Sequence, residues 1–307
     1  MTTHEISPTP ASTADVFDNA HAPVLTIEPG DTIVVGSLDA SGYLERQSVP
    51  GEQRPRLFPE PRGHALTGPI AVAGALPGDM LALRLVDIRT EGWGWTVAGA
   101  AESPITRRLG IDADAAAWLL WDLDAASGVA TESRGFTRSL APFLGVMGVA
   151  PAEAGEHSTI PPRAASGGNI DCRALTAGST LYLPVAVPDA LLYLGDGHAA
   201  QGDGEVGGTA IECPMTTRAI VDIARDRPLE SIHAETPTAR ITFGFDTDLN
   251  AASGDALDAM VTWMQTLYAV DKATALALAS TVVDLRVTQV ANGTWGVHAV
   301  LQNDVLR

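Results

Sequence analysis

The chain has 307 residues, of which 46% are hydrophobic and 18% are charged, a composition typical of globular proteins that bury a large core. Its 37 acidic and 19 basic residues give a formal net charge of −18. We therefore expect no nucleic acid and no membrane as a partner, because no basic surface is available to neutralise phosphates. Cys172 and Cys213 are too few for a disulfide scaffold, and the first residues lack the features of a secretory signal, so we expect a cytoplasmic protein.

The N-terminal half is predicted to be rich in β-strands. Residues 1–20 are rich in Thr, Ser, Ala and Pro, which indicates a loose lead-in. Apolar segments at residues 24–27 and 32–35 flank a Glu-Pro-Gly-Asp turn, and residues 80–86 follow a second Pro-Gly-Asp turn. Strands separated by Pro and Gly turns predict a β-sandwich or barrel-like body, with residues 21–165 as its N-terminal part.

Helical patterns appear later in the chain. Residues 112–120 are compatible with a short helix. Apolar side chains recur at helical spacing over residues 253–270, with Ser253 as the N-cap, and an Ala-rich segment predicts a second helix over residues 271–283, capped by its first residue. Alternating residues on both sides of an Asn-Gly turn predict a β-hairpin over residues 284–300.

These patterns together predict an α+β, β-rich protein. Residues 166–307 would form a motif-bearing β part and an α+β C-terminal part with two helices and a hairpin, closely packed against residues 21–165. Trp93 and Trp95, on either side of Gly94, favour a place in the core or an interface over a ligand platform, because aromatic residues mostly supply buried area.

The most informative segment is residues 195–205, which contains four Gly, three carboxylates, one His and one Gln. Glycine permits tight turns and a close approach of the backbone to a ligand, and the polar side chains are of the kinds that ligate metals, carry protons and bind amides. Either Asp alone could be a turn former, but the density of polar groups favours a functional site. The polar residues are Asp196, His198, Gln201, Asp203 and Glu205.

Two other glycine-containing segments have similar chemistry. A loop with Gly and Pro places His64 before a strand, and residues 166–171 place Asn169 and Asp171 after paired glycines. A single His in a loop is commonly a hydrogen-bonded or surface residue, and an Asn or Asp after Gly-Gly is commonly a turn residue. Glu212 follows the central segment, where an inward and a solvent-facing side chain are equally compatible with a strand.

Several common catalytic motifs are absent from the sequence. The chain has no Gly-x-Ser-x-Gly elbow, no His-Glu-x-x-His, no Cys-x-x-Cys, no Gly-x-x-x-x-Gly-Lys-[Ser/Thr] and no Gly-x-Gly-x-x-Gly that opens a helix after the first strand. Ser166 is a candidate nucleophile, but the sequence identifies no base beside it.

The polar segments, taken in chain order, resemble the acetamidase/formamidase family of metal-associated amidohydrolases. The resemblance extends from about residue 21 to the C-terminus, and the long segment from Gly195 is its most specific part. The matching segments are residues 28–31, His64 with 66–70, 77–79, 142–151, 161–163, 167–171, 178–185, 195–205 and 208–212.

The resemblance implies hydrolysis of a small linear amide, of the formamide or acetamide type, to a carboxylate and ammonia. It also implies a β-rich fold with an α+β part, a bound divalent metal and assembly into a homo-oligomer, a dimer or larger. The chain departs from the family pattern at Ala65, where Pro is common, and at Gly207, where Cys is common. The second departure argues against a thiol nucleophile at that position.

We expect Asp171, Asp196 and His198 to ligate the metal, because of their residue types and their places in the loops. A His together with carboxylates suits Zn²⁺ or a similar transition metal, whereas an all-oxygen set would favour Ca²⁺. A metal polarises the amide carbonyl and lowers the pKa of bound water.

The remaining polar positions divide into catalytic and substrate-binding candidates. Glu205 is expected to be the general base, His64 to ligate the metal or stabilise the oxyanion, and Asp203 is a further catalytic candidate. Asn169 and Gln201 are expected to orient the amide substrate.

Two alternatives remain compatible with the sequence. One is a non-catalytic, metal-stabilised β module that binds a small ligand, since Gly/Asp-rich loops also bind Ca²⁺ structurally. The other is the same hydrolysis on a larger or cyclic amide. The presence of His198, Gln201 and Glu205 together favours catalysis, because a structural Ca²⁺ site does not use imidazole.

Overall fold

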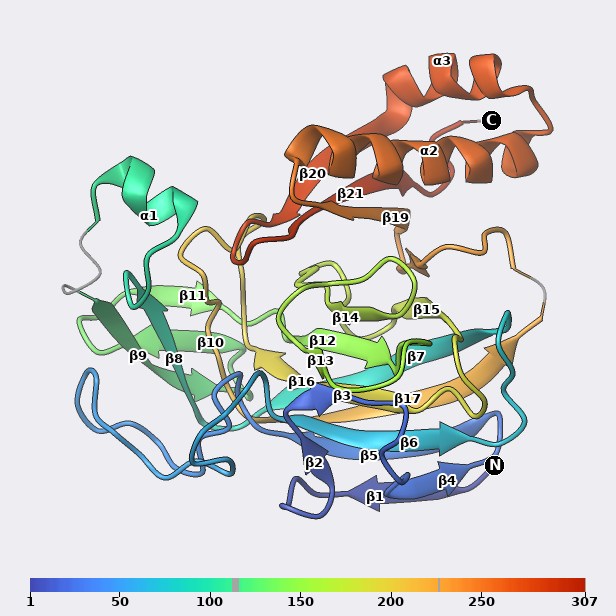
Figure 1. Cartoon of the computed structure of the whole chain (residues 1–307). Helices are drawn as coiled ribbons and strands as arrows, with labels where there is room; N and C mark the ends of the chain where they lie inside the picture. The colour runs from blue at the N-terminus through green and yellow to red at the C-terminus, as the bar shows by residue number, and fades with distance from the viewer. Residues whose placement is uncertain (112–115, 226, 307) are drawn as a thin grey trace.

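The computed structural model describes residues 1–111, 116–225 and 227–306, and a nine-stranded β-sheet is its largest element (Figure 1). Neighbouring strands are antiparallel except for the pair β1 and β5 at one edge. The strand order across the sheet is β1 (Thr3–Ile6), β5 (Asp31–Ser37), β17 (Met215–Ala224), β7 (Met80–Thr90), β15 (Thr180–Pro184), β18 (His233–Glu235), β19 (Ala239–Asp246), β21 (Trp295–Gln302) and β20 (Val283–Gln289).

A second sheet, of six strands, packs against the first. Apolar side chains of both sheets share one core, among them Leu83 and Val221 of the larger sheet and Met147 and Leu194 of the smaller. Burial of such side chains is the main stabilising contribution to a sandwich of this kind. The strand order is β14 (Gly167–Asn169), β12 (Phe143–Val149), β16 (Leu192–His198), β6 (Leu66–Val72) and β2 (Thr13–Ala14), and β4 (Leu25–Ile27) pairs in parallel with β6.

A smaller antiparallel sheet of four strands lies at one end of the molecule, next to helix α1 (Pro104–Leu109) (Figure 1). Its strands, in order, are β11 (Thr137–Ser139), β10 (Val129–Glu132), β9 (Ala117–Asp124) and β8 (Trp93–Ala98). Two short strands, β3 (Val16–Phe17) and β13 (His157–Ser158), form a separate pair.

Helices α2 (Leu249–Tyr268) and α3 (Lys272–Val282) lie over the edge of the nine-stranded sheet that is formed by the C-terminal strands. There α2 packs on β19 and β21 (Figure 1). Gly244 of β19 permits this close contact, because a Cβ atom there would lie 2.0 Å from the carbonyl oxygen of Ala252. Thr242 also donates a hydrogen bond of 2.6 Å to the carbonyl oxygen of Ala256. Among the described residues, no helix has the length and apolar character needed to cross a membrane.

The predicted fold class is confirmed: the protein is strand-rich, with helices and a hairpin in its C-terminal part. The helix predicted over residues 271–283 corresponds to α3, and the hairpin corresponds to β20 and β21. The helix predicted from Ser253 begins earlier, because the Asp248 side chain accepts the N-cap hydrogen bond from the Asn250 N–H. Ser253 instead donates to the carbonyl oxygen of Leu249 inside the helix.

Two other expectations differ from the structure. The helix predicted over residues 112–120 is wrong for residues 117–120, which belong to β9 and pair with β8; residues 112–115 lie outside the described residues. Residues 1–20 were expected to be loose, whereas β1 pairs with β5 and Phe17 is buried. In both cases pairing with a distant strand decides the conformation, and local composition does not report such pairing.

His233 makes the stability of the fold dependent on pH. Its ring stacks on Tyr182 and meets Trp263 edge-on, and burial lowers the pKa of His233 to about 4, although the Ser231 carbonyl oxygen opposes this shift. An unfolded chain binds a proton at this His below about pH 6.5, and the folded chain binds it only near pH 4. The contribution of His233 to stability is therefore complete above pH 6.5 and is lost as the pH falls toward 4.

We expect the free energy of unfolding to fall between pH 7 and 4.5, with about 2 kcal/mol of the decrease caused by His233. Urea denaturation at a series of pH values measures this dependence. His233→Phe keeps an aromatic ring and removes the titration, so its decrease should be smaller by that amount. His157→Gln, at a half-exposed His, is the matched control; equal pH slopes for His233→Phe and the wild type would contradict the assignment.

Candidate active site and metal centre

Three neighbouring strands of the six-stranded sheet position the candidate site. The pairing of β12 with β16 places Gly145 opposite Asp196, since Leu144 pairs with Gly197 and Val146 with Gly195. On its other side, the Gly145 carbonyl oxygen accepts hydrogen bonds from the N–H groups of residues 170 and 171, which follow β14. Asp171 and Asp196 therefore lie on either side of one glycine.

Four carboxylates surround one imidazole in this region. His198 is two residues after Asp196, so both side chains project from the same face of β16. The His198 Nε2 atom lies 3.4 Å from Asp196 Oδ1 and 3.3 Å from Glu212 Oε1. Candidate ligand atoms of Asp171, Asp196 and His198 lie within 4.8 Å of one another, and the same holds for His198, Glu205 and Glu212. Each of the five residues is at most 7% exposed.

Gln201 fixes the orientation of the His198 ring. The Gln201 side-chain oxygen lies 2.9 Å from His198 Nδ1, so this nitrogen donates the hydrogen bond, and the Gln201 amide nitrogen donates to the carbonyl oxygen of Asp171 at 2.8 Å. The His198 and Phe143 rings also pack in an edge-to-face arrangement, with ring centres 5.0 Å apart. Because Nδ1 binds Gln201, Nε2 faces the carboxylates. Metal-ligating His residues commonly have this arrangement, in which one ring nitrogen binds the metal and the other is held by a hydrogen bond.

The carboxylates leave room and unpartnered oxygens for a cation. A Cβ atom on Gly145 would lie 2.4 Å from Asp196 Oδ2 and 2.7 Å from Asp171 Oδ1, so only glycine keeps this space open. Both carboxylate oxygens of Asp171, Oδ1 of Asp196 and Oε2 of Glu212 are buried without a hydrogen-bond partner. Buried polar atoms are normally satisfied, and a carboxylate–imidazole donor set with open lone pairs suits a divalent metal ion.

The backbone is strained at three of these acidic residues. Asp171, Asp196 and Glu205 have φ angles of 52°, 59° and 43°, in the left-handed region that residues with a Cβ atom rarely occupy. Such conformations cost on the order of 1–3 kcal/mol each and persist where the surrounding structure imposes them. The strain lies at the residues whose side chains form the cluster, as is common at functional sites.

The charges of the cluster influence one another strongly. Burial raises the pKa of Asp171 and of Glu205 well above the usual range and raises the pKa of Glu212 to about 7, with the neighbouring carboxylates adding to each shift. Burial lowers the pKa of His198, but Glu212 and Asp196 outweigh it and raise that pKa well above the usual range. Burial also acts to raise the pKa of Asp196, yet the imidazoles of His198 and His64 bring it below its usual range.

His64 lies at the edge of the cluster, and Asn169 ends β14 two residues before Asp171. His64 Nε2 is 3.9 Å from Asp196 Oδ2, and burial lowers the pKa of His64 although Asp196 opposes this. The Thr159 hydroxyl oxygen accepts a hydrogen bond of 2.7 Å from the His64 backbone N–H and lies 2.9 Å from its Nδ1. Asn169 donates to the carbonyl oxygen of Ile160 and keeps a buried Oδ1 without a partner.

Most of the residues singled out in the sequence come together here, but Asp203 does not join them. Its carboxylate forms an ion pair of 2.9 Å with Arg173 and belongs to neither potential metal-ligand group. Gln201 holds His198 and Asp171 in place with both ends of its amide and also lines a cavity of about 420 Å³, so its role in orienting the substrate stays a prediction. Glu212, left undecided by the sequence, is 1% exposed and faces the cluster.

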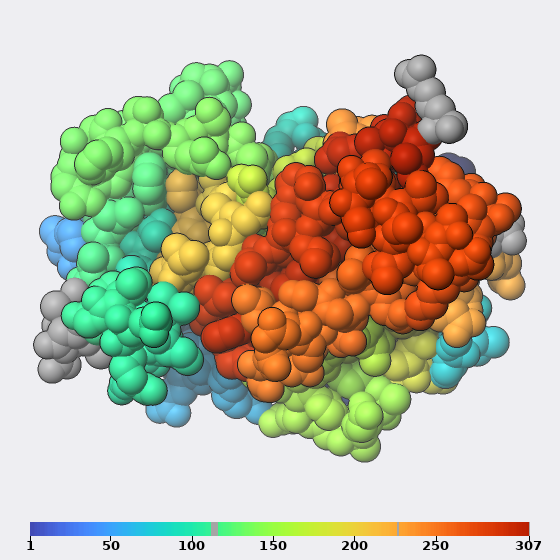
Figure 2. All heavy atoms as spheres, turned by 90° about the horizontal axis from the view of Figure 1, so that it is seen from above, coloured from blue at the N-terminus to red at the C-terminus, as the bar shows by residue number. Residues whose placement is uncertain are grey.

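Two cavities border the candidate site, one at His64 and the other at Glu205. One, of about 470 Å³, is lined by His64, by Tyr43 and by Trp95 and Trp118 of the four-stranded sheet. The other, of about 420 Å³, is lined by Gln201 and Glu205 on one side and by Trp121 and Arg138 on the other. In Figure 2 the yellow segment near residue 200 reaches the surface between the green four-stranded sheet and the red C-terminal strands. A small molecule in either cavity would lie next to a residue of the buried, charged site.

The space at Gly145 gives a direct test of metal binding. We expect Gly145→Ala to bind Zn²⁺ about 10- to 100-fold more weakly than the wild type, because its methyl group would displace the Asp171 and Asp196 carboxylates from their present positions. Competition with a chromogenic chelator measures the affinity. Gly254→Ala, at an exposed helical position with nothing within 4 Å of the added Cβ, is the control. Equal affinity of Gly145→Ala and the wild type would show that the metal binds elsewhere.

Relatives of this chain carry amidase names. A formamidase from Methylophilus methylotrophus is 27% identical over 233 residues, which cover 60% of this chain and 56% of that protein. An acetamidase from Mycolicibacterium smegmatis is 50% identical over 48 residues, 16% of this chain and 12% of that protein. The matches to the two curated relatives with the longest alignments span 64% and 56% of those relatives' own lengths.

Solved structures match over nearly the whole chain. An acetamidase from Bacillus halodurans superposes with a TM-score of 0.85 and 27% identity, covering 97% of both chains. An acetamidase from Yersinia enterocolitica superposes with a TM-score of 0.86 and 27% identity, covering 99% of this chain and 93% of that one. The model of the Acetamidase/Formamidase family matches residues 12–157 and 153–243, more than half of the chain. This chain therefore belongs to the Acetamidase/Formamidase family.

Proposed function

We propose that this protein hydrolyses the C–N bond of a small linear amide, of the formamide or acetamide type, to a carboxylate and ammonia, with the assistance of a divalent metal. The observation that carries the proposal is the buried group of four carboxylates around His198, with unpartnered oxygens and an open space at Gly145. Membership in the Acetamidase/Formamidase family supports this chemistry over a purely structural role for the cluster.

Asp171, Asp196 and His198 are the proposed metal ligands. Their ligand atoms lie close together, and the Gln201 oxygen holds His198 with Nε2 facing the carboxylates. A bound metal would supply Lewis acidity, which makes an amide carbonyl more electrophilic and water more acidic. Imidazole combined with carboxylates favours Zn²⁺ over Ca²⁺, which prefers oxygen ligands alone.

Glu205 is the proposed general base. Its carboxylate lies within 4.8 Å of His198, and it lines the cavity of about 420 Å³ between the four-stranded sheet and residues 200–211. Its carboxylate would take a proton from the attacking water and deliver that proton to the nitrogen that leaves as ammonia. Amide hydrolysis needs this transfer because an amide anion is a poor leaving group.

Asn169 and His64 are proposed to hold the two ends of the amide group. The buried, unpartnered Oδ1 of Asn169 can accept a hydrogen bond from the amide N–H. The Thr159 oxygen accepts from the His64 backbone N–H, so its hydroxyl hydrogen is free to bind Nδ1 of the ring. The proton of a neutral His64 then lies on Nε2, where it can be donated to the developing oxyanion.

The role of Glu205 is tested by Glu205→Gln. We expect kcat for acetamide to fall by about 100- to 10,000-fold, because the amide side chain has a similar shape and cannot take up a proton. Ammonia release measures turnover, and metal content is determined on the same sample. Glu91→Gln, at an exposed position between β7 and β8, is the control. Full turnover of a metal-loaded Glu205→Gln variant would remove Glu205 from the chemistry.

Metal dependence is tested by chelation. Prolonged dialysis against a strong chelator is expected to reduce turnover at least about 100-fold, and Zn²⁺ is expected to restore it better than Ca²⁺. Undiminished turnover by protein shown to contain no metal would limit any metal to a structural role. The cytoplasmic location and the homo-oligomeric assembly remain predictions from the sequence.

A further inference from the structure

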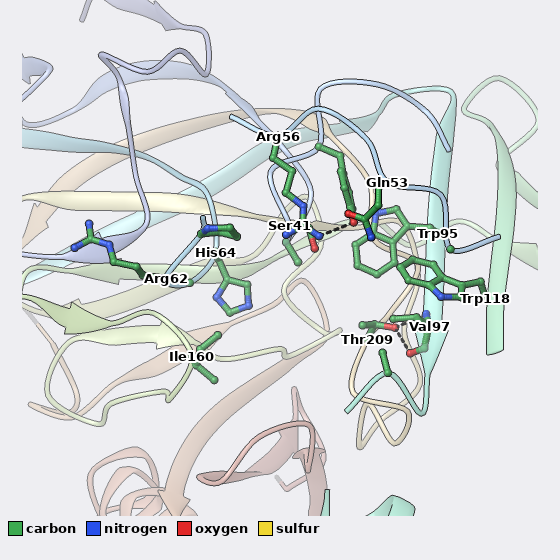
Figure 3. Close-up of a pocket in the computed structure, with 16 residues that line it drawn as sticks. Ser41, Gln53, Arg56, Arg62, His64, Trp95, Val97, Trp118, Ile160 and Thr209 are labelled. Carbon is green, nitrogen blue, oxygen red and sulfur yellow. Dashed lines mark hydrogen bonds between the residues drawn. The ribbon is translucent and has the colours of Figure 1, made fainter. Parts of the chain in front are cut away.

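The cavity beside His64 is much larger than formamide or acetamide requires. Its volume of about 470 Å³ lies within the range of roughly 300–1,000 Å³ found for pockets that hold drug-sized ligands, while one water molecule takes about 30 Å³ of the liquid. Figure 3 shows His64 at one end of this space and the indole rings of Trp95 and Trp118 at the other. Ile160 and Thr209 close it from a third side (Figure 3).

The far end of the cavity is a preformed aromatic wall. The Trp95 ring lies 6.0 Å from Tyr43 in an edge-to-face arrangement and 5.4 Å from Trp118. Trp95 Nε1 donates a hydrogen bond of 3.1 Å to the buried carboxylate of Asp39, which also accepts from the backbone N–H of Tyr43. A rigid wall of this kind lowers the entropic cost of binding a flat apolar group.

This wall is connected directly to the proposed catalytic cluster. The backbone of Trp95 exchanges two hydrogen bonds with Glu212, of 2.9 and 2.8 Å, and the Glu212 side chain faces His198. At the other end, His64 Nε2 is 3.9 Å from Asp196. An amide group held between His64 and the carboxylates would therefore direct its acyl substituent toward Trp95 and Trp118.

The charge at this end of the cavity also limits the substrate. The Arg56 guanidinium lies 4.6 Å from the centre of the Tyr43 ring and donates to the Tyr43 hydroxyl oxygen at 2.7 Å. Among the described residues, Arg56 forms no ion pair with a carboxylate within 4.0 Å. A cationic acyl group is disfavoured here, and a neutral aromatic group is compatible with the site.

We propose that this cavity selects primary amides with an aromatic acyl group, of the arylacetamide type. The inference rests on the amide hydrolysis proposed above and names its substrate class. Water would attack the carbonyl carbon, a C–O bond would form and the C–N bond would break. Both protons of water would end on the leaving nitrogen, so the products are the arylacetate and ammonium. The methyl group of acetamide leaves most of the cavity unfilled, whereas an aryl ring reaches Trp118.

The test compares 2-phenylacetamide with acetamide on the metal-loaded enzyme. We expect kcat/KM for 2-phenylacetamide to exceed that for acetamide by at least about 10-fold, and Trp118→Ala to reduce this ratio by about 10-fold or more. Trp118→Phe keeps a ring and should retain the ratio within about 3-fold. Trp93→Ala, which removes another indole of the same sheet that does not line the cavity, is the structural control. Quenching of tryptophan fluorescence by 2-phenylacetamide should weaken in parallel in Trp118→Ala.

Each other outcome has a defined meaning. Hydrolysis of acetamide without hydrolysis of 2-phenylacetamide overturns the inference and leaves the proposed function in place. No hydrolysis of either amide overturns both. An unchanged ratio in Trp118→Ala, combined with a reduced ratio in Trp121→Ala, would place the acyl group in the second cavity and overturn the assignment made here.

Discussion

The structure of the site depends on the burial of several carboxylates within a few ångströms of one imidazole. Removing an ion from water costs several kcal/mol even after the protein relaxes, and like charges at short range add to that cost. His198 compensates only part of it, because Asp171 and Glu212 keep buried oxygens without partners. Such a set is stable when a cation completes it, which is why we interpret the cluster as a metal centre.

The sheets supply the support that this arrangement needs. Pairing of β12 with β14 and β16 brings Asp171 and Asp196 to either side of Gly145, and the core shared with the nine-stranded sheet lies behind them. Left-handed backbone at Asp171, Asp196 and Glu205 is unfavourable locally and requires a rigid surrounding structure. A large, well-packed β-sandwich therefore suits a site whose own residues destabilise it.

Much of this structure could be predicted from the sequence, and the exceptions share a physical cause. Strand alternation, Pro-Gly turns and helical periodicity predicted most of the fold, because these patterns are local. The start of α2 was missed because Asp248 and Ser253 are both suitable N-caps. In the structure Ala252 packs on Gly244, and the helix begins four residues before Ser253, at Leu249. Residues 117–120 were misassigned because their conformation depends on pairing with β8.

In the candidate site too, local patterns could be predicted from the sequence and long-range contacts could not. The density of His, Gln and carboxylates in residues 195–205 marked it without any knowledge of the fold. Glu212 could not be assigned, because its direction depends on its pairing with Trp95, and Thr159 gave no signal, because it contacts His64 across 95 positions of sequence. Trp95 was expected in the core or an interface, and its ring is indeed buried, but it also lines the cavity.

The backbone pairing of Trp95 with Glu212 joins two parts of the site that come from different sheets: the carboxylate cluster and the wall of the cavity beside His64. Gly94 allows β8 to approach Glu212, since a Cβ atom there would lie 2.8 Å from the Glu212 carbonyl oxygen. The four-stranded sheet thus meets the cluster through backbone contacts, while Trp118 extends from β9 into the cavity, at the end opposite His64 (Figure 3). A change at Trp118 alters the space for an acyl group without moving a charged residue, whereas a change at Trp95 also disturbs the support of Glu212. Substrate range can therefore vary on β9 while the six-stranded sheet keeps the geometry of the cluster.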